Sequence, residues 1–98
     1  MFSKQEFDEV AMQDFWTWFR TNQISDILHM NREMGTRLQK LCGGKNSGWY
    51  DMGWDLRRNK AYITFWADAT KPVRNCFKRL IELAPYDIKE NWELRVEN

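Results

Sequence analysis

The sequence is poor in the residues that build metal and nucleophile sites. It has one histidine, His29, and two cysteines, Cys42 and Cys76, whose spacing matches no metal-binding motif. No glycine-rich phosphate loop follows a predicted strand, since the Gly43-Gly44 pair follows a helical segment instead. Both cysteines fall on apolar helical stripes, where we expect buried thiols, although the sequence alone leaves their pairing open. We therefore expect no catalytic residue, no cofactor and no metal.

The sequence also lacks an excess of one charge and a long apolar run. Fifteen Lys and Arg face fourteen Asp and Glu, which leaves a net charge of +1 with His neutral. A protein that binds nucleic acid by electrostatics alone carries more positive charge than this. No segment approaches the roughly eighteen apolar residues that span a bilayer, and charged residues from Lys4 onward interrupt any signal peptide. We expect a cytoplasmic protein with no membrane partner.

Aromatic residues, by contrast, are abundant. Six Trp and six Phe occur among the 98 residues, and large rings supply much apolar area to the core of a short chain. A chain of this length suits one hydrophobic core. We therefore expect a single α+β domain that spans residues 1–98.

The first predicted helix begins with a capping box at Ser3 and Glu6, and Phe2 and Phe7 stand at the positions of a hydrophobic staple. Its apolar stripe consists of Phe7, Val10, Ala11, Phe15, Trp18 and Phe19. Trp16 lies on the other side of this helix, with Met12 on its flank. These two residues are either covered by the second helix or form a surface patch.

Two further helices follow from the same periodicity. The second spans residues 24–42 and ends at Gly43-Gly44, with Gly35 placed to allow either the close approach of another helix or a kink. The third is capped by Thr70, carries Pro72 in its first turn and ends at Ala84-Pro85.

The segment from Trp49 to Asp68 predicts a β-hairpin with one apolar face. A two-residue turn at Arg58-Asn59 aligns four apolar pairs, which are Leu56 with Ala61, Trp54 with Ile63, Met52 with Phe65, and Tyr50 with Ala67. The opposite face carries two aromatic rings among polar groups, namely Asp51, Asp55, Tyr62, Thr64 and Trp66.

A last strand alternates Trp92, Leu94 and Val96 inward with Glu93, Arg95 and Glu97 outward. The element order α-α-β-β-α-β predicts a two-layer sandwich in which the helices cover one face of a three-stranded sheet. The last strand pairs beside either the first or the second strand. We favour the first, which gives the order 2-1-3 and a split β-α-β unit with a right-handed crossover.

The run Phe-Trp-x-Trp-Phe at Phe15–Phe19, with Asn22 beyond it, and the segment from Pro85 to Asn91-Trp92-Glu93 resemble small uncharacterised bacterial proteins. Those proteins are built as a helix plus half of a ferredoxin-like fold. The resemblance implies that fold and a bacterial source. It attaches no activity, so it assigns no functional residue.

The polar face of the hairpin is the candidate functional surface. We expect a non-catalytic adaptor, inhibitor or immunity-type domain that binds another protein or a second copy of itself. The residues assigned to this contact are Asp51, Asp55, Tyr62, Thr64, Trp66 and Arg95.

The alternative is single-stranded nucleic acid stacked on Tyr62 and Trp66, which the nearby carboxylates disfavour. Catalysis has little support, because Asp51 and Asp55 lie about 13 Å apart on one strand, too far to act on one bond.

Overall fold

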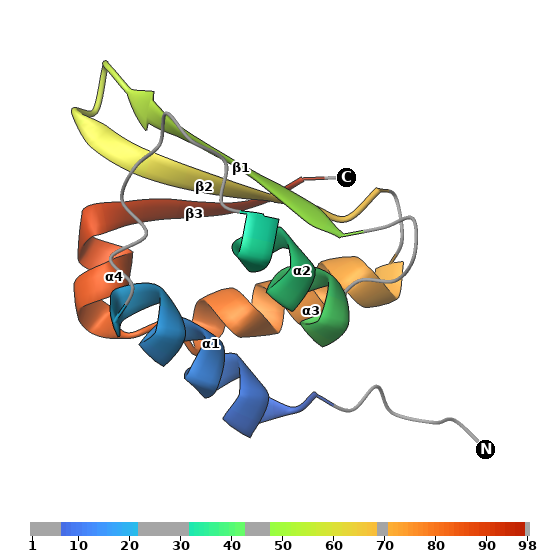
Figure 1. Ribbon diagram of the computed structural model, residues 1–98. Coiled ribbons are helices and arrows are strands. Elements are labelled where there is room, and N and C mark those ends of the chain that lie inside the picture. The colour runs from blue at the N-terminus through green and yellow to red at the C-terminus, as the bar shows by residue number, and fades with distance from the viewer. Residues whose placement is uncertain (1–6, 22–31, 43–47, 69–70, 98) are drawn as a thin grey trace.

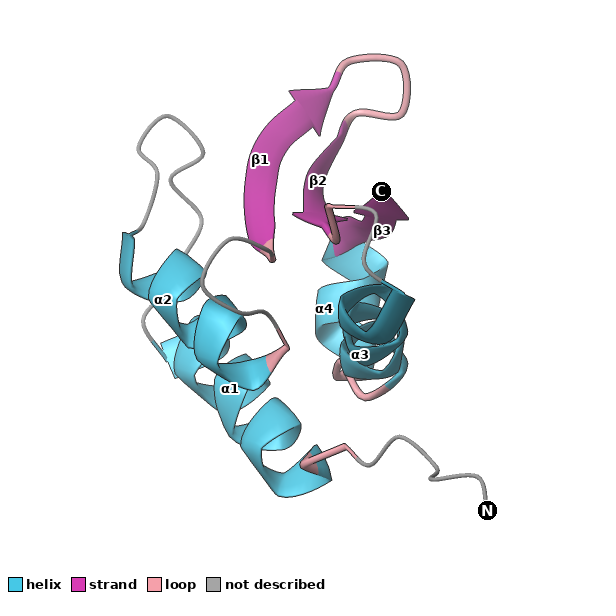
Figure 2. Cartoon of the chain, turned by 90° about the vertical axis from the view of Figure 1, so that its right-hand side faces the viewer, coloured by secondary structure: helices cyan, strands magenta, loops and turns pink. Residues whose placement is uncertain are grey.

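The computed structural model describes residues 7–21, 32–42, 48–68 and 71–97 (Figure 1). Within these ranges the elements are α1 (Glu9–Thr21), α2 (Arg32–Leu41), β1 (Trp49–Asp55), β2 (Lys60–Trp66), α3 (Lys71–Glu82), α4 (Tyr86–Asn91) and β3 (Trp92–Glu97). The described helices lie on one side of a three-stranded mixed sheet (Figures 1 and 2). The predicted α+β class, with helices on one face, is therefore correct. In the described part of the chain no helix is both long and apolar enough to cross a bilayer.

The strand order is β1-β2-β3, so the predicted order 2-1-3 is wrong. β1 and β2 are antiparallel, and β3 runs parallel to β2 on its other side. The central place suits β2 because its residues Ala61, Ile63 and Phe65 are all buried. β1 contains Gly53 and two aspartates, which an edge strand tolerates better than a central one does.

The hairpin register differs from the prediction by two residues. Tyr50 pairs with Phe65, and Trp54 pairs with Ala61. A longer turn over residues 56–59 replaces the expected two-residue turn. The carboxylate of Asp55 accepts the backbone N–H groups of Arg57 and Arg58 at 2.9 and 3.3 Å, and Asn59 adopts a positive φ of 52°. Since side chains alternate with a period of two, this shift leaves each residue on its predicted face.

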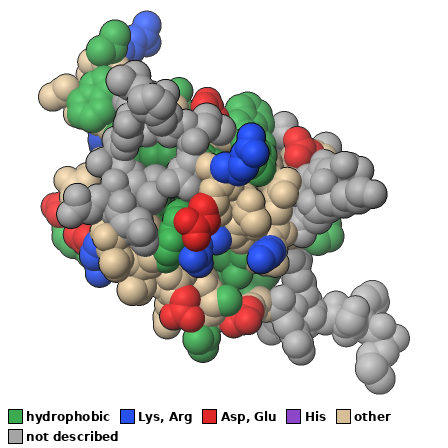
Figure 3. Space-filling model, in the orientation of Figure 1, with side chains coloured by type: hydrophobic (Ala, Val, Ile, Leu, Met, Phe, Trp, Pro, Cys, Tyr) green, Lys and Arg blue, Asp and Glu red, His purple; other side chains and the backbone are tan. Residues whose placement is uncertain are grey.

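The closed end of the hairpin projects past the helices (Figure 1), and hydrophobic side chains gather there on the surface (Figure 3). Leu56, predicted to pair with Ala61, lies in the turn and is 88% exposed. Trp54 was expected in the core, yet 46% of it is exposed. It points to the helix side of the sheet, but it is not among the described residues that pack against the core.

The core lies between the sheet and the helices, and Trp16 is part of it. Only 1% of Trp16 is exposed, and Met12 is fully buried, so neither forms a surface patch. The Trp16 ring packs edge-on against Phe65, which stacks on Phe77 at 5.2 Å between ring centroids. The buried side of the first helix therefore keeps Phe15 and Phe19 of its predicted stripe but is rotated to include Met12 and Trp16.

That side is set by the spacing of the four buried residues of α1, which are Met12, Phe15, Trp16 and Phe19. Val10 lies opposite them and is 69% exposed. Asp8 precedes the helix and accepts the backbone N–H of Ala11 at 3.0 Å, which is an N-cap contact. Phe7 lies before the helix. The capping box predicted at residues 3–6 lies outside the described residues.

α3 agrees with its prediction, and Val73, Cys76, Phe77 and Leu80 are buried. All four of its last carbonyl groups, which have no partner inside the helix, accept a hydrogen bond. The carbonyl oxygens of Arg79 and Ile81 accept the backbone N–H groups of Leu83 and Ala84. The oxygens of Leu80 and Glu82 accept side-chain bonds from Trp16 and Lys89. The Trp16 indole N–H reaches the Leu80 oxygen at 2.8 Å. This bond ties α1 to the end of α3.

Cys42 and Cys76 form a disulfide with their Cα atoms 5.3 Å apart, so the expectation of two free thiols is wrong. The bond joins the end of α2 to the middle of α3. The helical stripes that predicted burial also turn these two sulfurs toward each other. Of the predicted second helix, residues 32–41 are helical, and residues 24–31 lie outside the described ranges.

Two local features complete the fold. The Trp49 ring lies directly against Gly35 of α2, where a Cβ would overlap it, so the close neighbour at this glycine is a side chain of β1, where we expected a helix. The short helix α4 was not predicted. It has a single buried residue, Ile88, and this is too little for a recognisable helical stripe. β3 follows it directly and matches its predicted strand.

Candidate functional site

The candidate site is the sheet face that points away from the helices, called here the open face. Alternate residues of the three strands lie on it, and the end residues Trp49 and Lys60, whose side chains contact α2 and α4, are not counted among its members. Its members are Asp51, Gly53, Asp55, Tyr62, Thr64, Trp66, Glu93, Arg95 and Glu97. The sheet therefore brings all six residues of the predicted contact onto one surface. β3 joins this surface through β2, whereas the prediction placed it beside β1.

Arg95 and Tyr62 form a stack at the centre of the open face. The Arg95 guanidinium carbon lies 4.6 Å from the centroid of the Tyr62 ring, within the range of a cation–π contact. The other side of the ring lies against Gly53, its partner across the β1–β2 ladder, where a Cβ would overlap the phenol. Gly53 therefore gives the ring room to lie flat on the sheet.

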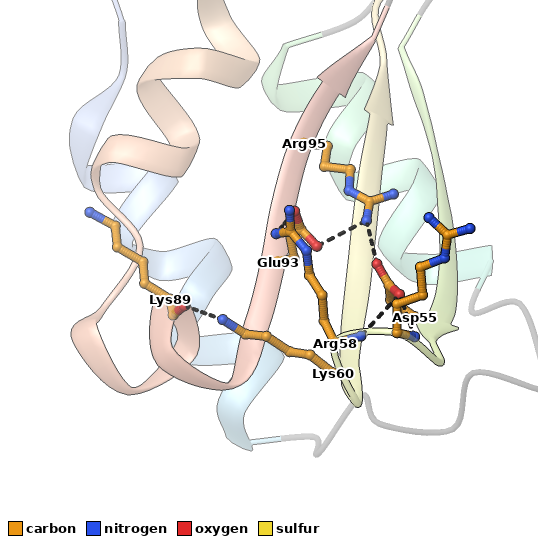
Figure 4. Close-up of polar contacts among 7 residues, drawn as sticks. Asp55, Arg58, Lys60, Lys89, Glu93 and Arg95 are labelled. Atoms are coloured by element: carbon orange, nitrogen blue, oxygen red, sulfur yellow. Dashed lines mark hydrogen bonds and ion pairs between the residues drawn. The ribbon is translucent and has the colours of Figure 1, made fainter.

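Two carboxylates hold the guanidinium of Arg95 in this place (Figure 4). Arg95 Nη2 donates to Glu93 at 2.9 Å and contacts Asp55 at 3.4 Å. Arg58, from the hairpin turn, donates to the other oxygen of Glu93 at 2.7 Å. The hydrogen bond from Arg95 lowers the pKa of Glu93, and the charge of Arg58 lowers it further. The same bond raises the pKa of Arg95. Both shifts keep the Glu93–Arg95 pair charged at neutral pH.

The other end of the face is more exposed. Trp66 is 38% exposed. Glu97 is its neighbour on β3, and Asp51 lies one pair further along β1. Both are exposed. Neither has an ion pair with a charged residue in the described ranges. Thr64 lies between the two ends and is only 5% exposed, so it offers little area to a partner.

The described residues also line two hollows, and sequence reasoning predicted neither. One of about 330 Å³ lies between α1 and α2, with Asp8 and Asp14 on one wall and Arg37 and Lys40 on the other. Arg37 is already engaged, since it bonds Glu33 at 3.1 Å and lies over the Trp18 ring. The second, of about 260 Å³, lies beside β3 and is lined by both Lys60 and Lys89. No local motif signals either one, because each is formed by packing of distant segments.

The described residues contain no group of three or more His, Cys, Asp or Glu placed to hold a metal ion. His29 lies outside these residues. No protein family, no curated protein and no solved structure matches this chain.

Proposed function

We propose that this protein is a non-catalytic protein-binding domain and that the open face is its contact surface. The observation that carries the proposal is Trp66, a large ring exposed among charged side chains on a sheet face that no described helix covers. Tryptophan, tyrosine and arginine are the residues that most often dominate binding energy at protein interfaces. The partner is another protein or a second copy of this chain.

The charges of the surface favour a basic partner. Four carboxylates, those of Asp51, Asp55, Glu93 and Glu97, lie there beside two guanidinium groups, those of Arg58 and Arg95. Complementary charge speeds encounter and selects among partners. The alternative, single-stranded nucleic acid, is disfavoured by the same carboxylates. In addition, Arg95 covers the side of Tyr62 that a base would need for stacking.

The proposal is tested by capture on the immobilised protein from an extract of its host. We expect a specific protein to be retained by the unaltered chain and lost with Trp66→Ala. Tyr86→Ala, an exposed aromatic on α4, is the matched control and should retain it. Equal capture by the unaltered chain, Trp66→Ala and Tyr86→Ala would contradict the choice of surface. Loss of the captured protein with Leu56→Ala, at the end of the hairpin, would contradict it as well. Sedimentation velocity on the same variants tests self-association.

Salt separates the two kinds of partner. A complex with single-stranded nucleic acid should weaken steeply as salt is added, because counterions are released from each neutralised phosphate. A contact centred on an exposed tryptophan should weaken much less. A steep slope together with loss of the retained material on nuclease treatment would replace the protein partner with a nucleic acid.

The expected cytoplasmic location is tested by a separate measurement. The Cys42–Cys76 bond favours an oxidising compartment, where disulfides form and persist. Trapping thiols with an alkylating reagent in intact host cells decides the point. Complete alkylation of both cysteines would support the cytoplasmic proposal, and full protection would reject it.

A further inference from the structure

The open face contains the same arrangement twice. In the first, Tyr62 of the central strand β2 lies between Asp55 of β1 and Glu93 of β3. We call these three residues the tyrosine set. A step of four residues along each of the three strands leads to Trp66, Asp51 and Glu97, which we call the tryptophan set. The register preserves the spacing of this step, while the β1 residue paired with the ring is Gly53 in the tyrosine set and Trp49 in the tryptophan set. Each ring is paired with its glutamate on β3, and each aspartate lies one pair away on β1.

The tyrosine set holds a guanidinium. Arg95 lies 4.6 Å above the ring and reaches Glu93 at 2.9 Å and Asp55 at 3.4 Å. The ring thus matches the flat face of an arginine guanidinium, and the two carboxylates on the neighbouring strands match its N–H groups. The fold itself shows which ligand this arrangement suits.

The tryptophan set receives no such side chain from the described residues. Asp51 and Glu97 are exposed and form no ion pair there, and Trp66 is 38% exposed. Arg95 is paired with Thr64, midway between the two sets, but its guanidinium is bound to the carboxylates of the tyrosine set. An indole attracts a cation more strongly than a phenol does, so the second set is at least as suitable for a guanidinium as the first.

We propose that the tryptophan set binds an arginine side chain presented by a basic partner protein. This inference rests on the proposed function and names the chemistry of the partner. The guanidinium lies over the Trp66 ring and donates to Asp51 and Glu97. Arginine fits better than lysine, because a planar guanidinium stacks on a ring while its N–H groups reach carboxylates on both sides.

The test uses N-acetyl-arginine amide as the probe and its neutral counterpart, N-acetyl-citrulline amide, as the control ligand. The indole N–H resonance of Trp66, assigned by its loss in Trp66→Phe, reports binding in solution. We expect the arginine compound to shift this resonance at a concentration about ten-fold lower than the citrulline compound does. No shift with either compound, or equal shifts with both, would overturn the proposal.

Two sets of variants sharpen the result. Asp51→Asn with Glu97→Gln should abolish the difference between the two compounds, whereas Asp14→Asn with Glu90→Gln removes the same charge from the helix side and should preserve it. Arg95→Gln opens the tyrosine set, so the arginine compound should now also shift the Tyr62 ring resonances. An unchanged response in the first double variant would overturn the proposal, as would an unaffected Tyr62 in Arg95→Gln.

The outcome is independent of partner capture. If capture depends on Trp66 but the arginine compound does not bind, the open face is a contact surface with a different chemistry, and only the further inference fails. If the compound binds as expected but capture is equal for all variants, the arginine site stands as a chemical property of the face, and the proposed protein-binding function fails.

Discussion

The burial of Trp16 predicts that a tryptophan-to-phenylalanine change lowers the free energy of unfolding more at Trp16 than at Trp54. Trp16→Phe removes the indole N–H that bonds the Leu80 oxygen at 2.8 Å and leaves that buried acceptor without a partner. An unsatisfied buried acceptor costs about 1–3 kcal/mol, and the volume lost from a packed core adds about 1 kcal/mol. We therefore expect the free energy of unfolding to fall by about 2–4 kcal/mol.

Trp54→Phe is the matched control, because Trp54 is 46% exposed and is not among the described residues that pack against the core. This change should cost about 1 kcal/mol or less. Urea unfolding followed by circular dichroism measures both variants, and the slope with denaturant should stay the same. Equal losses at the two sites would refute the account of which tryptophan supports the core. A larger loss at Trp54 would restore the sequence-based prediction that this ring is buried.

Three further predictions concern the disulfide, the ion network and the stack on the open face. Replacing both Cys42 and Cys76 by Ala should lower stability by about 3–4 kcal/mol, from the entropy of closing a 34-residue loop; an unaltered urea midpoint would mean that the bond does not form. The pKa of Glu93 is lowered in the folded state, so its contribution is present above the ordinary carboxyl pKa and is lost as the pH falls through the lowered value. Glu93→Gln should therefore weaken the pH dependence of stability below about pH 5, and an identical profile would contradict the network. Gly53→Ala should displace the Tyr62 ring, because the added Cβ overlaps it. Tyr62 ring resonances that stay in place would show that the ring does not lie on Gly53.

The faces of the sheet could be predicted from the sequence although the register could not. The predicted turn was two residues too short, yet Ile63 and Phe65 still face the helices, and Tyr62 and Trp66 still face away. An even shift cannot move a side chain across a strand. The candidate surface was therefore robust to an error in the turn. Its inner contacts were not foreseen, since the stack of Arg95 on Tyr62 depends on which strand β3 joins.

How deeply a side chain is buried was harder to predict than the face of the sheet to which it points. Trp54 and Ile63 lie on the same side of the sheet, but one is half exposed and the other fully buried. Periodicity reports direction, and it does not report how far the helix layer extends. Trp16 illustrates the same limit, because its burial depends on α3, which lies more than fifty residues away along the chain.

The sequence by itself determined those features that depend on a single segment of the chain. The alternation in residues 49–68 and 92–97 and the stripe of α3 are of this kind, because backbone geometry repeats every two or 3.6 residues whatever surrounds it. Only the tertiary structure decided the strand order, the bond between Cys42 and Cys76 and the placing of Trp16. Each of these depends on the distance between segments far apart in the chain, which local periodicity does not contain.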